Sequence, residues 1–211
     1  YFEHNRKTKG EYIVERILAG ESCAIITDAG TPAISDPGVD LVDLCAKAGI
    51  EVVAVPGCAA VVAALSISGM ACGRFTFEGF LPVPKKERRA HLEEVKTEKR
   101  TMVFYEAPHK LQRTLQDMLE CWGDRKIALC REITKLHEEC RRTTLSQAVA
   151  HYTENPPRGE FVLVLLCLHF CSLPLLLQFL LKLTQLKFIK LCFPFHPTVR
   201  LCAMFICAMR E

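Results

Sequence analysis

The chain has 211 residues and a formal net charge of +3; 50% of its residues are hydrophobic and 24% are charged. This composition is typical of a globular protein and excludes a disordered or fibrous one. The small net charge does not by itself indicate a nucleic-acid partner, so an RNA-binding surface would need locally clustered basic residues.

The first part of the chain alternates between helical and strand patterns. Asp36 is a favourable N-cap, Pro37 suits a first helical position, and Gly49 ends the helix that follows. The predicted helices cover residues 10–18, 37–48 and 59–68, and the predicted strands cover 22–27 and 51–55.

A change of composition near Gly73, where glycines and aromatic residues gather, predicts a domain boundary. The part that follows has its own alternation, with helices over 86–96, 108–122 and 145–152 and strands over 101–105, 126–130 and 160–165. Such alternation is typical of an α/β fold. We therefore predict one domain over residues 1–73 and a second over 74–166.

Residues 167–211 form a tail rich in Leu, Phe and Cys, without a regular period. No charged residue occurs from Phe161 to Leu181, a run long enough to span a bilayer core of about 30 Å. A membrane anchor is one interpretation. Because Pro174 interrupts the run, we favour a hydrophobic extension that is foreign to the rest of the chain.

Twelve cysteines are scattered singly, without a C-x-x-C pair. Buried free thiols act as small hydrophobic residues, and we predict that role for them. The spacing indicates neither a disulfide framework nor a metal site, and it fits a reducing compartment.

Three loops at strand ends carry the candidate ligand-binding residues, because open α/β sheets bind ligands at the carboxyl ends of their strands. In the first loop, Gly30 allows close approach to the backbone, and Asp28 offers a carboxylate to a cation or to hydroxyls. In the second, Ala59 and Ala60 open a helix whose free amides could hold a carboxylate. Each loop could equally be a tight connection without a ligand.

The third loop is FYEAPHKL, residues 104–111. Tyr105 could stack on an aromatic ring, and Glu106 and His109 are titratable groups at a strand end. In the alternative interpretation, Glu106 caps the helix that Pro108 opens and His109 is merely exposed.

Six segments in one order resemble the bacterial 16S rRNA cytidine 2′-O-ribose methyltransferases of the tetrapyrrole-methylase superfamily. They are DAGTPAISDPG (28–38), VPG-x-x-A (55–60), FEGFLP (77–82), FYEAPH-x-L (104–111), RE-x-TK (131–135) and GEFVLV (159–164). The resemblance runs from about Tyr1 to Leu166 and is specific, because order and spacing agree. Residues 167–211 match nothing in that family.

The resemblance implies a two-domain α/β methylase that binds S-adenosylmethionine in the cleft between its domains. It implies cofactor-binding residues in all three loops: Asp28, Gly30, Thr31, Ala59, Ala60, Tyr105, Ala107 and Pro108. It also implies a homodimer that acts on 16S rRNA of the small ribosomal subunit, in the cytoplasm or, for a plant or algal protein, in an organelle.

The chain departs from the family pattern at several positions. Cys58 and Ala59 stand where the family usually has Pro and Ser, and Thr143 replaces a usual Gly. The chain begins at Tyr1 without the family's first strand and T-P-I-G-N loop, so we expect an incomplete N-terminal domain. Two alternatives therefore stay open: a methylase of a small tetrapyrrole or corrin precursor, and an inactive truncated product whose tail associates with membranes or proteins.

Methyl transfer needs an acceptor oxygen aligned with the methyl group, and a nearby base would take the proton of a ribose hydroxyl. Glu106, His109 and His4 are the candidate bases, and catalysis by positioning alone is the alternative.

A basic cluster follows the FEGFLP segment and could hold RNA phosphates without reading sequence. It consists of Lys85, Lys86, Arg88 and Arg89, with Lys99, Arg100, Arg141 and Arg142 in support. Because glutamates are interleaved with these residues, a solvated helix face is the alternative.

Overall fold

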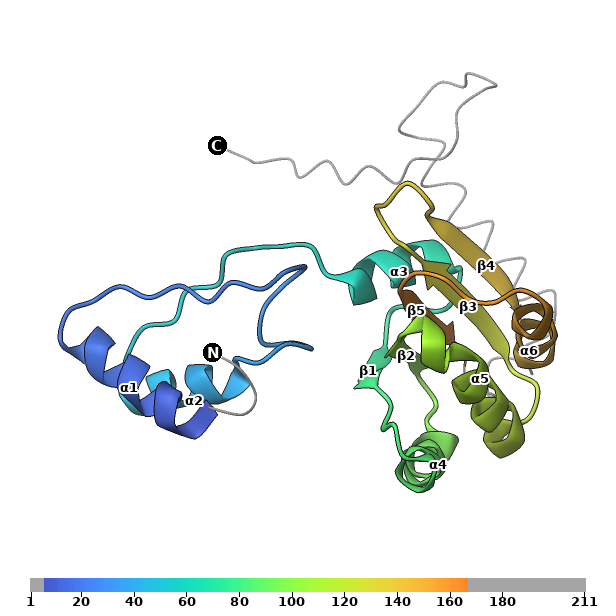
Figure 1. The fold of residues 1–211 in the computed structure, drawn as a ribbon, viewed down its shortest axis with the longest axis horizontal. Coiled ribbons are helices and arrows are strands. Elements are labelled where there is room, and N and C mark those ends of the chain that lie inside the picture. Colours follow the sequence, from blue (N-terminus) through green and yellow to red (C-terminus); the bar gives the residue numbers. More distant parts are fainter. Residues whose placement is uncertain (1–5, 167–211) are drawn as a thin grey trace, which may run out of the picture. The chain divides into compact units, whose positions relative to one another are not determined.

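The structure is a computed structural model that describes residues 6–166, with side chains from residue 9 onward (Figure 1). The tail over residues 167–211 and the candidate base His4 lie outside the described residues. Within 6–166, no helix combines the length and the apolar character needed to cross a membrane.

A five-stranded mixed sheet forms the centre of residues 75–165. Its strand order is β1 (Phe75–Phe80), β2 (Thr101–Glu106), β5 (Phe161–Leu165), β3 (Lys126–Arg131) and β4 (Glu139–Thr144). β1 runs parallel to β2, whereas β5 is antiparallel to both of its neighbours. Every residue of β5 is buried. A central strand covered on both faces is expected to be apolar throughout, as FVLVL is.

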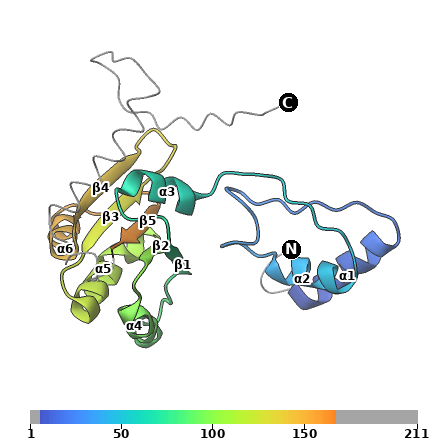
Figure 2. The ribbon, with the colours of Figure 1, turned by 180° about the vertical axis from the view of Figure 1, so that it is seen from behind.

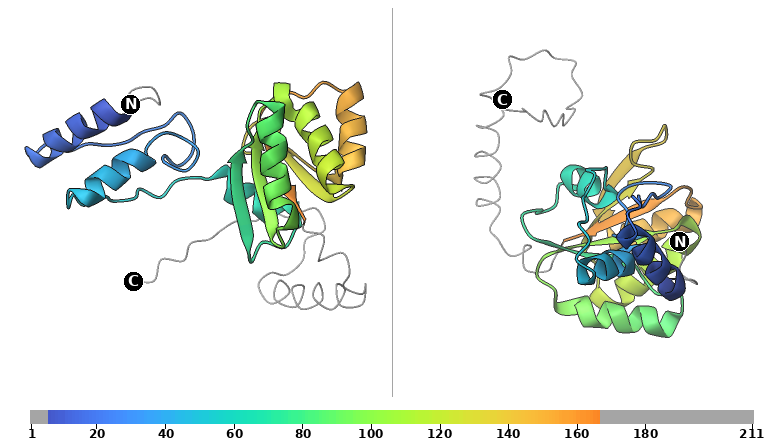
Figure 3. Two further views of the ribbon diagram at one scale, coloured as in Figure 1. Left: turned by 90° about the horizontal axis from the view of Figure 1, so that it is seen from below. Right: turned by 90° about the vertical axis from the view of Figure 1, so that its left-hand side faces the viewer.

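Helices cover both faces of this sheet (Figures 2 and 3). The helices are α4 (Lys85–Glu94), α5 (Pro108–Trp122) and α6 (Leu145–Glu154) on one face and α3 (Ala60–Ser68) on the other. Phe161, Leu163 and Leu165 of β5 join the first core, and Val162 and Val164 join the core under α3. Side chains alternate between faces along a strand, so one short strand serves both cores.

The elements predicted after Gly73 are confirmed, and the α/β class with them. The helix over Pro108–Trp122 has the predicted bounds, with Pro108 at its start and Gly123 at its end. The sequence does not predict β1 and β4. β4 is an edge strand without a fully buried residue, so its sequence, ECRRTT, lacks the apolar alternation that would reveal it.

The two strands predicted in the first part of the chain are wrong. Residues 22–27 and 51–55 form no strand, although their β-branched sequences favour one. A strand needs a neighbour that takes up its N–H and C=O groups, and neither segment is paired within the described residues. Their apolar side chains are correspondingly uncovered: Ile26 is 89% exposed and Val55 is 84% exposed.

α1 (Arg6–Leu18) and α2 (Val39–Lys47) pack against each other. α2 begins later than predicted, with Gly38 at its N-cap. Asp36 instead accepts a hydrogen bond of 2.9 Å from the hydroxyl of Thr27. The predicted capping role of Asp36 is therefore wrong, because its carboxylate closes the preceding loop.

Candidate functional site

The first two candidate turns lie against each other. The hydroxyl of Thr31 donates a hydrogen bond of 3.1 Å to the carbonyl oxygen of Cys58. Gly30 has a φ of +81°, a conformation that favours glycine, and a Cβ at this position would lie 3.5 Å from the same carbonyl. Asp28 is exposed beside this turn. Cys58 thus holds the first loop through its backbone, which needs no particular side chain.

The second turn opens α3 at Ala60, which is exposed, after Ala59 at the N-cap. Alanine has no polar side chain, so the helix start lacks a local cap. The amide of Val61 instead donates a hydrogen bond of 3.0 Å to the hydroxyl oxygen of Tyr105 on β2. This bond joins the second candidate turn to the strand that leads into the third.

Tyr105 is half-buried. Two aromatic rings contact its ring, and the amide of Val61 donates to its hydroxyl. Its ring centroid is 4.9 Å from that of Phe77 and 5.6 Å from that of Phe80, both in edge-to-face geometry. Burial raises the pKa of Tyr105, which keeps its hydroxyl neutral. A neutral phenol that accepts from Val61 retains its own proton, which it can donate.

At the third turn, Glu106 is not placed as a catalytic base would need to be. Its side chain is buried, with 3% of the residue exposed. One carboxylate oxygen accepts the amide of Ala107 at 2.9 Å, and the other accepts the hydroxyl of Thr114 at 2.6 Å. Glu106 therefore holds Ala107, the N-cap residue of α5, but it accepts from no amide within the helix and does not cap it. His109, in the first turn of α5, is exposed.

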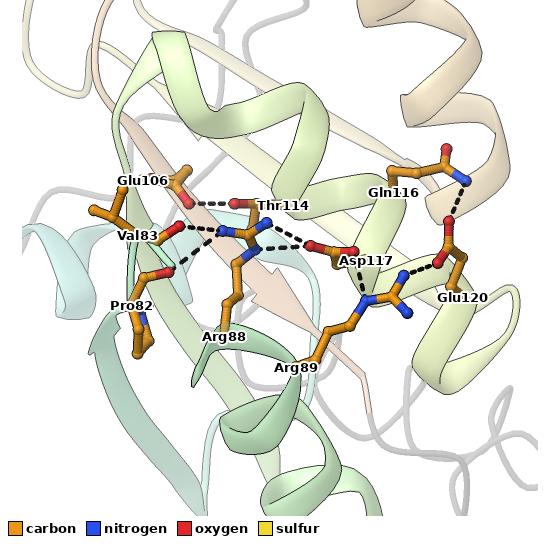
Figure 4. A network of polar contacts seen from close by, with 9 residues as sticks. All are labelled: Pro82, Val83, Arg88, Arg89, Glu106, Thr114, Gln116, Asp117 and Glu120. Carbon is orange, nitrogen blue, oxygen red and sulfur yellow. Dashed lines mark hydrogen bonds and ion pairs between the residues drawn. The ribbon is translucent and has the colours of Figure 1, made fainter. Parts of the chain in front are cut away.

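Arg88 and Arg89 both belong to the network of polar contacts in Figure 4, Arg88 in its buried part and Arg89 at its exposed edge. Arg88 is 4% exposed; its Nε and Nη2 donate to one oxygen of Asp117 at 2.8 and 2.6 Å, and its Nη1 donates to the carbonyl of Val83 at 2.8 Å. Arg89 donates to the other oxygen of Asp117 at 3.0 Å and pairs with Glu120. The predicted phosphate-binding role of Arg88 is corrected, because its buried charge is already matched.

The exposed part of the predicted basic cluster is therefore smaller. Lys85 and Lys86 are exposed at the start of α4, as is Lys99 in the loop before β2. The supporting arginines are engaged within the chain: Arg100 pairs with Glu98, Arg141 pairs with Glu139, and Arg142 donates to the carbonyls of Ile67 and Ser68. Arg142 thereby caps the carboxyl end of α3, where a cation is favoured.

Two surface concavities lie elsewhere. One is lined by residues 34–40 and the other by Arg74 and residues 94, 95 and 97–100. Neither is lined by the candidate cofactor-binding residues. What links those residues is the chain of contacts from Thr31 to Cys58 and from Val61 to Tyr105.

Residues 2–149 match the family described as Tetrapyrrole (Corrin/Porphyrin) Methylases. The chain is 46% identical over 166 residues to the ribosomal RNA small subunit methyltransferase I of Synechocystis sp., covering 78% of this chain and 60% of that protein. The protein of the same name from Halalkalibacterium halodurans is 48% identical over 164 residues, covering 78% of this chain and 57% of that protein. The protein of the same name from Thermotoga maritima is 45% identical over 163 residues, covering 77% of this chain and 73% of that protein. The chain thus spans less than two thirds of the first two relatives.

Solved structures share the fold at low sequence identity. The methyltransferase CobJ has a TM-score of 0.59 at 20% identity, covering 80% of this chain and 72% of that one. Diphthine synthase has a TM-score of 0.58 at 11% identity, covering 79% of this chain and 68% of that one.

Proposed function

The chain belongs to the tetrapyrrole (corrin/porphyrin) methylase family, and we propose that it acts as an S-adenosylmethionine-dependent methyltransferase on ribosomal RNA of the small subunit. The names of its bacterial relatives support this substrate. The motif resemblance narrows the proposed acceptor to the ribose 2′-hydroxyl of a cytidine in 16S rRNA.

The observation that carries the proposal is the pair of hydrogen bonds that links the candidate turns. Thr31 ties the first turn to Cys58, and Val61 at the start of α3 is tied to Tyr105. Tyr105 directly precedes the turn at Glu106 and Ala107. The first turn is therefore bonded to the second, and the second is bonded to the residue before the third.

The residues at these turns fit two of the three charged groups of S-adenosylmethionine, its sulfonium and its carboxylate. The exposed carboxylate of Asp28 suits a sulfonium cation, and the exposed helix start at Ala60 suits a carboxylate, because the positive end of the α3 dipole lies there, although the amides of Val61 and Val62 are already bonded to Tyr105 and Ala59. Gly30 and Gly57 present backbone without side-chain bulk. When bound, the cofactor supplies an electrophilic methyl group on a sulfonium.

Of the candidate bases, His109 is the one that we propose for taking the proton of the ribose hydroxyl. Glu106 is buried and bonded through both of its oxygens, whereas His109 is exposed on the first turn of α5. An exposed imidazole can accept the proton of a ribose hydroxyl as the oxygen attacks. The remaining contribution is alignment of the acceptor oxygen, which turns linked by hydrogen bonds can supply.

Lys85 and Lys86 form the proposed RNA contact. Both are exposed at the first turn of α4, and no ion pair is found for either within the described residues. Two such cations can hold phosphates and orient the RNA without reading its sequence. The proposed homodimer is checked by sedimentation analysis of the full chain.

Transfer of a labelled methyl group to small ribosomal subunits that lack the modification tests the proposal. We expect label in 16S rRNA at a cytidine 2′-oxygen. Label only in an added tetrapyrrole or corrin precursor would support a small-molecule methylase instead. No heat of S-adenosylmethionine binding in calorimetry would identify a non-catalytic product.

A further inference from the structure

Two cysteines face each other on neighbouring strands, away from the candidate turns. Cys130 of β3 and Cys140 of β4 are partners in the antiparallel register, and their Sγ atoms are 3.5 Å apart. Both are free thiols. A pair formed across two strands has no short sequence spacing, so a search for C-x-x-C does not find it.

The positions of these two residues suit a disulfide. Directly opposed residues on antiparallel strands have Cα atoms about 4.5–5.5 Å apart, and disulfides join Cα atoms about 4.4–6.8 Å apart. The sulfurs, now 3.5 Å apart, must approach to about 2.05 Å. Rotation of the two side chains can supply this movement without displacing the strands.

The two thiols differ in a way that assigns their roles. Cys130 is fully buried and Cys140 is partly exposed. The S–H of Cys130 donates to Cys140, and this hydrogen bond is the main cause that lowers the pKa of Cys140. Arg142 acts in the same direction, whereas burial, Glu138 and Glu139 oppose it. Cys140 is therefore the attacking thiolate, and Cys130, whose pKa is raised by the same contact, closes the disulfide.

Both thiols also contact the carboxyl-terminal half of α3. The Sγ of Cys130 lies 3.9 Å from the carbonyl oxygen of Ala64, and that of Cys140 lies 3.5 Å from that of Ile67. A disulfide has no S–H to donate, so oxidation removes the donation from Cys140 to the carbonyl of Ile67; the one proton of Cys130 is already donated to Cys140, so Cys130 only packs against Ala64. The opposite end of the same helix begins at Ala60, in the second candidate turn.

We propose that Cys130 and Cys140 form a reversible disulfide that loosens α3 and thereby weakens cofactor binding; the effect on the cofactor rests on the proposed function. The oxidant is a low-molecular-weight disulfide such as oxidised glutathione. The Cys140 thiolate attacks one glutathione sulfur, forming a mixed disulfide and releasing one glutathione. Cys130 gives up its proton, attacks the Sγ of Cys140 and displaces the second glutathione. The two protein thiol protons leave with the two reduced glutathiones.

Peptide mapping of the full chain after treatment with oxidised glutathione tests the disulfide. We expect a crosslinked pair of peptides that contain Cys130 and Cys140 and together lack two hydrogens. Cys140→Ser should abolish this species, whereas Cys121→Ser, which removes a partly buried thiol on α5, should leave it unchanged. A stable glutathione adduct on Cys140 with no crosslink in the unsubstituted chain would overturn the proposal.

Amide hydrogen exchange tests the effect on α3 without any cofactor. Exchange of residues 61–68 should quicken severalfold on oxidation, recover with dithiothreitol and stay constant in Cys140→Ser. Unchanged exchange in a crosslinked chain would refute the coupling. The dissociation constant of S-adenosylmethionine should rise severalfold on oxidation. If neither redox form binds it while α3 still responds, the proposed function fails and the disulfide switch stands.

Discussion

The hydroxyl of Tyr105 accepts a hydrogen bond of 3.0 Å from the amide of Val61, so a side chain of β2 caps the first turn of α3. The N-cap residue, Ala59, cannot provide that cap. A cap from a distant strand fixes the helix relative to the sheet, which a local Ser or Thr would not do. The position of the second candidate turn therefore depends on the third.

Tyr105→Phe removes this cap and keeps the ring. Because one helix-terminal amide loses its partner, we expect the free energy of unfolding to fall by about 1 kcal/mol and the affinity for S-adenosylmethionine to fall with it. Urea denaturation and calorimetry measure the two effects. Tyr12→Phe, at a residue 55% exposed on α1, is the control and should change neither.

Asp28→Asn keeps the size of the side chain and removes its charge. If this carboxylate faces the sulfonium, the affinity for S-adenosylmethionine should fall on the order of tenfold, about 1.4 kcal/mol. Asp43→Asn, an exposed carboxylate paired with Lys47 on α2, should leave the affinity unchanged. Equal affinities in the two variants would place the cofactor elsewhere.

Arg88→Met should act on stability. It leaves the 4%-exposed side chain of Asp117 with Arg89 as its remaining cationic partner, and breaking a buried ion pair costs about 3–5 kcal/mol. We expect the free energy of unfolding to fall by about 3 kcal/mol in urea denaturation, at the lower end of this range because Arg89 still pairs with Asp117. Lys85→Met should change stability by less than about 0.5 kcal/mol. A stable Arg88→Met chain with weakened RNA binding would restore the phosphate role of Arg88.

Replacing Lys85 and Lys86 together by Ala should weaken RNA binding without affecting the fold. Each phosphate contact that is lost should reduce the slope of log affinity against log salt by about 0.7–0.9. Filter binding of an rRNA fragment at several salt concentrations measures this slope. Lys47→Ala serves as the control. An unchanged slope in the double variant would show that RNA binds elsewhere.

Glu98 links stability to pH. The side chain of Arg100 donates to it, with its own amide in support, and these contacts lower the pKa of Glu98 to about 2. Because the pKa of Glu98 is lower in the folded than in the unfolded chain, ionised Glu98 stabilises the fold. This stabilisation is complete above the unfolded pKa of about 4.3 and is lost as the pH falls toward 2. Glu98→Gln should therefore be less stable than the unsubstituted chain at pH 7, and this difference should vanish near pH 2. A difference that persists in urea denaturation at pH 2 would contradict the linkage.

Local signals in the sequence determined much of the fold. Pro108 and Gly123 bound α5, the apolar run of β5 indicated a strand, and the six ordered segments indicated the family. These features depend on capping, on backbone restriction by Pro and Gly, and on side-chain period, which neighbouring residues alone decide.

Only the tertiary structure decided which residues became partners. The sequence shows Arg88 as one of several cations and Cys130 as one of several scattered thiols, and neither Asp117 nor Cys140 lies near its partner along the chain. It also favours strands over 22–27 and 51–55, but a strand forms only where a neighbour accepts its backbone hydrogen bonds. Pairing between distant segments is a property of the folded chain, so local propensity cannot supply it.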